Sequence, residues 1–148
     1  MSSDIIEISR VIKAPPERVF RAFITPGAVE KWFPPHGFLC KVHELDSRVG
    51  GRVRFSLIDF PTGYVHSCTA EFLEVEPCRR LRYRMEYDNP YLAGKMEVTV
   101  TLRAVFCGVE LHISRQGTPA TMPREAVVLG WQDSFDLLAK LVEADARE

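Results

Sequence analysis

The sequence lacks the segments that would carry a protein into or across a membrane. No apolar run approaches the roughly 20 residues that a membrane-spanning helix needs. The first residues, MSSDIIEISR, have neither the basic start nor the apolar core of a secretory signal peptide. We therefore expect a cytoplasmic protein that has no membrane partner.

Signatures of metal, phosphate and nucleophile chemistry are also missing. The four cysteines stand apart rather than at the short spacings of zinc ligands, so we expect no metal and reduced thiols that mostly pack. The Gly50-Gly51 pair lacks the lysine and the helix start of a phosphate-binding loop. No HExxH or nucleophile-elbow motif occurs. We expect no cofactor, and we assign no catalytic residue.

Neither sign of charge is in excess. The chain has 19 Lys and Arg against 20 Asp and Glu, which gives no signal for nucleic acid or an anionic membrane. Arg80, Arg82 and Arg84 form a basic row on one face of a predicted strand, and Glu86 interrupts it. We interpret this row as a solvated strand face and expect no nucleic-acid partner. With 148 residues, the chain is expected to form a single domain, 1–148, with a real core.

The longest periodic segment is residues 121–143, which we expect to form one helix. Apolar residues recur there at steps of three and four and form one stripe: Val128, Trp131, Phe135, Leu138 and Val142, widened by Val127, Ala139 and Leu141. Thr121 is suited to cap the start, and Pro123 fits the first turn. Gly130 beside Trp131 predicts a close backbone approach, at a helix-propensity cost of about 1 kcal/mol.

The rest of the chain alternates apolar and polar residues with a period of two. This pattern predicts about seven strands near residues 5–12, 38–43, 52–58, 64–75, 80–87, 96–102 and 109–115. Two short helices are expected after the first strand, the first at 17–24 and the second starting near Pro26. The phase of the fourth strand slips, which predicts a bulge near residues 71–73. Short turns imply an antiparallel meander, so we predict an α+β fold in which a curved sheet grips the long helix.

Five stretches of the chain match a known family in order and spacing. They are APPERVFRAF, AVEKWFPPHGF, DSRVGGRVRF, the pair FLEVEP and RRLRYR, and GWQDSFDLLAKLVE. Together they resemble the SRPBCC superfamily, and within it the group similar to the C-terminal domain of the activator of the ninety-kilodalton heat-shock protein ATPase. The resemblance covers residues 8–142. It implies a START-like, Bet v 1-like helix-grip fold, which agrees with the pattern of strands and helices.

The resemblance implies three kinds of function. Members resemble carriers of lipids, polyketides and hormones, so we favour binding of a small hydrophobic or amphipathic ligand between the sheet and the C-terminal helix. A cyclase-like or hydrolase-like enzyme using the same pocket is the first alternative. The second is a stress-related interaction module with a chaperone partner, although we expect the chain to lack the separate N-terminal domain that supplies much of that binding in the eukaryotic co-chaperone. A homodimer is compatible with the sequence.

Polar and adaptable residues on inward-facing strand positions are the candidates for the site. The candidate ligand-binding residues are Arg115, His66, Cys68, Tyr83, Met85, Tyr87, Met96, Phe55 and Trp32. Tyrosine and methionine side chains build adaptable pockets but also pack cores, and Trp32 fits a core position as well. These residues are therefore predicted either to line a pocket or to fill the core.

Alternatives stay open for the polar members of this set. Arg115 is suited to clamp a carboxylate or phosphate of a bound ligand with two hydrogen bonds. The alternatives are that its side chain reaches the solvated rim of the pocket or pairs with an internal acid such as Glu44. His66 is a candidate general base or polar contact, or a structural histidine. Cys68 is a nucleophile candidate with no visible third residue to orient a Cys–His pair.

Overall fold

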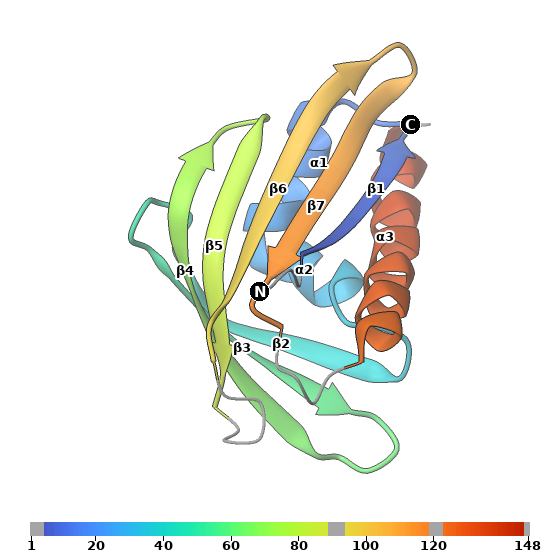
Figure 1. The fold of residues 1–148 in the computed structure, drawn as a ribbon. Helices are drawn as coiled ribbons and strands as arrows, with labels where there is room; N and C mark the ends of the chain where they lie inside the picture. The colour runs from blue at the N-terminus through green and yellow to red at the C-terminus, as the bar shows by residue number, and fades with distance from the viewer. Residues whose placement is uncertain (1–4, 89–93, 119–122, 147–148) are drawn as a thin grey trace.

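The protein folds as one curled antiparallel sheet that holds a long helix on its concave side (Figure 1). The computed structural model describes residues 5–88, 94–118 and 123–146, and side chains to residue 143. The elements are β1 (Ile6–Ile12), α1 (Pro16–Ile24), α2 (Pro26–Trp32), β2 (Phe38–Leu45), β3 (Arg52–Asp59), β4 (Val65–Glu76), β5 (Arg80–Tyr87), β6 (Met96–Val105), β7 (Gly108–Gln116) and α3 (Arg124–Ala146). The strand order is β1-β7-β6-β5-β4-β3-β2. The predicted α+β helix-grip fold is confirmed.

Alternation along the strands separates the core from the outer face of the sheet. In β6, for example, the inward side chains of Met96, Val98, Val100 and Leu102 are buried, while the residues between them are partly exposed. The predicted bulge in β4 is present, where the pairing with β5 shifts between Phe72 and Glu74. A second shift, between Val42 and Glu44 in β2, was not predicted.

The helix α3 packs against the concave side through the predicted stripe. Its most buried side chains are Val127, Trp131, Ser134, Phe135, Leu138, Ala139 and Val142, whereas Val128 and Leu141 are only partly buried. Two polar contacts fix α3 along β1: Arg10 pairs with Asp136, and the Glu143 carboxylate accepts a hydrogen bond from the Lys13 backbone at 2.9 Å. The predicted capping residue, Thr121, lies outside the described residues.

Two short helices close the space beside α3. Pro16 starts α1 and Pro26 starts α2, each in the first turn, where a missing N–H is tolerated. The Trp32 indole donates a hydrogen bond to the Ala22 carbonyl at 2.8 Å, which locks α2 onto α1. The Glu30 carboxylate accepts from the Val42 backbone N–H at 2.7 Å and thereby covers part of the β2 edge. The loop 33–37 then leads from α2 into β2 beside α3.

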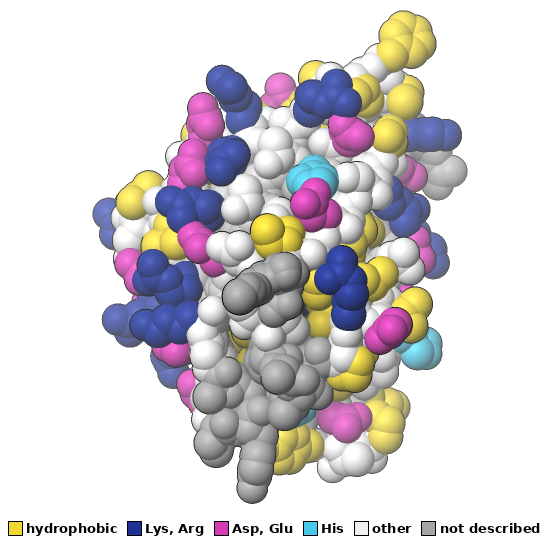
Figure 2. Space-filling view, viewed as in Figure 1, with side chains coloured by type: hydrophobic (Ala, Val, Ile, Leu, Met, Phe, Trp, Pro, Cys, Tyr) yellow, Lys and Arg dark blue, Asp and Glu magenta, His cyan; other side chains and the backbone are white. Residues whose placement is uncertain are grey.

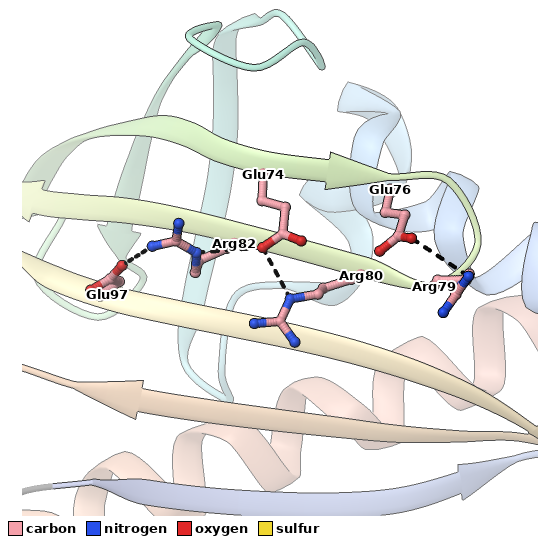
Figure 3. Close-up of polar contacts among 6 residues, drawn as sticks. All are labelled: Glu74, Glu76, Arg79, Arg80, Arg82 and Glu97. Atoms are coloured by element: carbon pink, nitrogen blue, oxygen red, sulfur yellow. Dashed lines mark hydrogen bonds and ion pairs between the residues drawn. The ribbon is translucent and has the colours of Figure 1, made fainter.

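Carboxylates of neighbouring strands pair with the arginine row on the outer face of the sheet (Figure 3). Glu74 accepts from Arg80 at 3.0 Å and lies 3.5 Å from Arg82, which also pairs with Glu97. Arg84 lies in register with Glu71 on one side and Glu97 on the other. In the view of Figure 2, acidic side chains lie among the basic ones. This arrangement agrees with the interpretation of the row as a solvated strand face.

Within residues 5–88, 94–118 and 123–146, none of the helices combines the length and the hydropathy needed to cross a bilayer.

Candidate functional site

A cavity of about 350 Å³ lies between the sheet, the loop 33–37 and α3. We call it the main cavity. It is lined by Phe33, Pro35, Phe38, Leu57, His66, Met85, Tyr87, Arg115, Ala126, Val127, Gly130, Trp131 and Ser134. Its volume falls at the lower end of the range of small-molecule sites, roughly 300 to 1,000 Å³. Most of the lining is apolar, with a few polar groups, which is the usual composition of such sites.

A second, deeper space of about 60 Å³ lies beside it. We call it the deep pocket. It is enclosed by core side chains of α1, α2 and strands β2 to β5. Its volume is well below that of small-molecule sites, so we regard it as a packing gap.

Arg115 is the charged side chain in the lining of the main cavity. It stands near the end of β7 and is only 6% exposed, so the alternative in which it is solvated at the rim is wrong. Glu44, the other partner considered, is exposed on β2 and does not line the cavity. The guanidinium contacts the Met96 sulfur at 2.8 Å and acts electrostatically on the neighbouring Tyr87 phenol. Arg115 therefore places a cation within a mostly apolar wall.

Tyr87 lies beside Arg115 in the same wall. Burial raises the pKa of the Tyr87 phenol, and the neighbouring guanidinium opposes that shift without reversing it. The phenol therefore stays protonated at neutral pH. It can donate a hydrogen bond to an acceptor on a bound molecule.

His66 enters the cavity from the first residues of β4. Its ring lies against Tyr64, with centroids 4.7 Å apart, and near Phe38, at 6.2 Å. The Nδ1 atom is buried and has no hydrogen-bond partner in the described part of the chain. An unsatisfied buried polar atom is costly, so a polar group of a ligand would gain by meeting it.

Part of the α3 wall of the cavity is formed by small residues four positions apart. Ala126, Gly130 and Ser134 fall on one face of the helix. The Ser134 hydroxyl donates to the Phe33 carbonyl at 2.6 Å and lies 3.1 Å from the Gly130 carbonyl. The Asp133 carboxylate accepts from the His36 backbone at 3.4 Å. These contacts tie the loop 33–37 to α3.

The structure brings together part of the predicted set. Arg115, His66, Met85 and Tyr87 line the main cavity. Phe55, Trp32 and Tyr83 line only the deep pocket, where Met85 also lies.

Cys68 and Met96 line neither space. Cys68 is 2% exposed, and burial, with the nearby Asp88 and Cys40 as smaller causes, raises its pKa to about 12. Its sulfur contacts the His66 carbonyl at 3.8 Å, rather than the imidazole. A thiol of this kind is not a nucleophile at neutral pH, so the hypothesis of a Cys–His pair finds no support.

Several cavity residues were not predicted to be part of the site. Val127 and Trp131 were predicted only as part of the apolar stripe of the C-terminal helix, and Phe33 and Leu57 were not assigned to the site. Pro35, Phe38, Ala126, Gly130 and Ser134 were not singled out as ligand contacts. The signal available in the sequence was the run of small residues at four-residue spacing, with a glycine in the middle of a long helix.

Comparison with known proteins assigns the chain to a family. A family model described as "Activator of Hsp90 ATPase homolog 1-like protein" matches residues 13–143. A crystal structure from Chromobacterium violaceum is 45% identical and has a TM-score of 0.92, covering 95% of this chain and 97% of that one. A structure from Rhizobium leguminosarum is 27% identical and has a TM-score of 0.79, and the match covers 95% of this chain and 94% of that one. A structure from Rhodobacter sphaeroides shares the fold, with a TM-score of 0.84 and 24% identity, and the match covers 97% of this chain and 94% of that one. The comparison with curated proteins found no match.

Proposed function

This chain belongs to the family of Activator of Hsp90 ATPase homolog 1-like proteins. We propose that it binds a small amphipathic molecule in its main cavity, between the sheet and α3. The apolar part of the ligand lies against Phe33 and Trp131, and an anionic head lies at Arg115. The observation that carries this proposal is a buried guanidinium beside a half-buried phenol in the wall of a mostly apolar cavity of about 350 Å³.

The apolar lining supplies most of the binding free energy. Each methylene group of the ligand that the lining removes from water contributes about 0.8 kcal/mol before the entropy of association is subtracted. Trp131 and Phe33 are packed edge to face, with ring centroids 5.8 Å apart, and present a rigid aromatic surface. A rigid surface keeps the entropy cost of binding low.

The polar groups give orientation and charge selectivity. An arginine fork matches the two oxygens of a carboxylate, and a charge-assisted hydrogen bond is roughly twice as strong as a neutral one. Tyr87, which stays protonated, adds a donor beside Arg115. An acid should therefore bind better than an alcohol of the same chain length.

Titration calorimetry with octanoate and octanol tests the proposal. The native chain should bind octanoate at least tenfold more tightly than octanol, and Arg115→Gln should remove that preference. The matched control is Arg103→Gln, because Arg103 is an exposed arginine of β6 that pairs with Glu110 and does not line the cavity. Tyr87→Phe gives a second, milder variant and should weaken octanoate binding a fewfold. Equal affinity for acid and alcohol in the native chain would contradict the proposed anionic head.

His66 supports an enzyme of the cyclase or hydrolase kind as a second candidate function. Its buried Nδ1 atom, without a hydrogen-bond partner among the described residues, is available to move a proton of a bound substrate. A His66→Gln variant that keeps full turnover of an identified substrate would remove His66 from such a mechanism.

We also propose a cytoplasmic location, on the grounds of the sequence alone. Fractionation of cells that express a tagged chain tests it, since recovery with membranes or in the medium would contradict it.

A further inference from the structure

Gly130 stands in the middle of α3, where a glycine is costly. The helix runs from Arg124 to Ala146, so Gly130 is well inside it. Glycine in a helix interior is about 1 kcal/mol less favourable than alanine, because it loses more backbone entropy. A glycine at this place therefore needs a reason that offsets the cost.

Neither backbone conformation nor packing supplies the reason. Gly130 is absent from the described residues with positive φ. A Cβ atom built on it would meet only the Pro35 Cβ, at 3.8 Å, which is ordinary van der Waals contact. The prediction of a close backbone approach at Gly130 is therefore wrong. At Gly51, by contrast, a Cβ would lie 2.1 Å from the Asp46 carbonyl oxygen, so that glycine is required by packing.

The main cavity supplies the reason. Gly130 is part of its wall, and the loop 33–37 lies opposite. That loop cannot retreat from a larger side chain without losing the bonds that Ser134 and Asp133 make to Phe33 and His36. Four carbon atoms of a leucine at position 130 would therefore occupy the cavity instead of moving its wall.

We propose that Gly130 sets the size limit of the ligand, and that the ligand is a compact amphipathic acid. The space beside Gly130 receives the apolar end of the ligand, while the acid lies at Arg115. A volume of about 350 Å³ suits such a molecule better than a two-chain lipid. This inference rests on the proposed function and adds to it the size class of the ligand.

Two probes of different size test the inference, namely benzoate and 2-naphthoate. Affinities are measured by titration calorimetry, and quenching of tryptophan fluorescence provides a second readout because Trp131 lines the cavity. The variants are Gly130→Ala and Gly130→Leu. The matched controls are Gly27→Ala and Gly27→Leu, because Gly27 is an exposed helical glycine of α2 with no heavy atom within 4 Å of a built Cβ. Circular dichroism and a thermal melt confirm that each variant folds.

Selective loss of the larger probe is the expected result. The dissociation constant for 2-naphthoate should rise at least tenfold in Gly130→Leu and a fewfold in Gly130→Ala, while that for benzoate changes less than threefold. Both Gly27 variants should bind 2-naphthoate within twofold of the native chain.

Three results would overturn the inference. If Gly130→Leu binds 2-naphthoate as tightly as the native chain, the size limit lies elsewhere, although the proposed function stands. If Gly130→Leu loses both probes equally, the residue blocks the cavity without selecting by size. If the native chain binds octanoate but neither aromatic probe, the inference fails and the proposed function stands; if it binds none of the three, both fail. Should Gly130→Leu not fold, Gly130→Ala decides between these results.

Discussion

Replacing Trp131 by alanine tests whether α3 is held to the sheet as the structure shows. Trp131 is 6% exposed, and its ring lies 5.8 Å from those of both Phe33 and Phe135. Large buried aromatics cost about 3 to 5 kcal/mol when cut to alanine. We expect Trp131→Ala to lower the free energy of unfolding by about 3 kcal/mol, at the low end of that range.

Two features of the site explain why the expected loss of stability in Trp131→Ala lies at the low end of the range for buried aromatics. One side of the Trp131 ring borders the main cavity, so that side already lacks packing partners. Alanine is also the better helix former, by up to about 0.7 kcal/mol. Phe135 is 1% exposed and does not border the cavity, so Phe135→Ala should cost about 4 kcal/mol, more than Trp131→Ala.

Urea unfolding followed by far-ultraviolet circular dichroism measures both variants. The control is Leu129→Ala, because Leu129 is on the same helix but 61% exposed, and its loss should stay within about 0.5 kcal/mol. A loss below about 1 kcal/mol for Trp131→Ala would refute the packing of α3 described above. So would a Leu129→Ala variant that is as destabilised as Phe135→Ala.

Three further predictions concern thiols, pH and glycines. In the folded protein, a thiol reagent at pH 8 should modify exposed Cys107 first. Cys68 should react only after unfolding, because burial raises its pKa to about 12. Mass mapping of the labelled peptides checks this order. Folding raises the pKa values of the Cys40 and Cys68 thiols from 9.0 to about 12, so their contribution to stability should be complete below about pH 9 and should diminish as the pH rises towards 12. The free energy of unfolding should therefore fall over that pH range. The fall should be less steep in Cys68→Ala, which lacks one of the two thiols. Gly130→Ala should raise the free energy of unfolding by up to about 1 kcal/mol. Gly51→Ala should lower it by about 2 kcal/mol or more, because the new Cβ would lie 2.1 Å from a backbone oxygen. Thermal melting of both variants measures the two changes, and changes of the opposite sign would contradict the account.

The fold could be predicted from the sequence because its strands carry regular alternation. The bulge in β4 was predictable because the apolar phase changes within one strand, around Phe72. The shift in β2 was not, because His43 and Glu44 are both exposed and polar there, so the phase change leaves no mark. On α3 the stripe was predicted nearly as found, with Val127 more buried than Val128.

The site was harder to predict than the fold, since a cavity depends on what the side chains leave unfilled. Arg115 was identified by its face of β7, but its burial depends on Met96 and Tyr87, which come from other strands. The wall at Pro35 depends on a loop conformation that no periodicity encodes. Gly130 was noticed, yet assigned to close packing, because the sequence does not show whether the space beside a glycine is filled or empty.

Nuclear magnetic resonance with 2-naphthoate tests the central claim, that the main cavity is a ligand-binding site, most directly. The isotope-labelled chain is titrated while backbone amides, the Trp131 indole and the Arg115 guanidinium are followed. The account predicts one saturable set of shifts at Gly130, His66, Tyr87, Arg115 and the Trp131 indole, with outer-face residues such as Arg80 unmoved. Saturable shifts confined to residues outside the cavity, or no shifts at a large excess of probe, would contradict it.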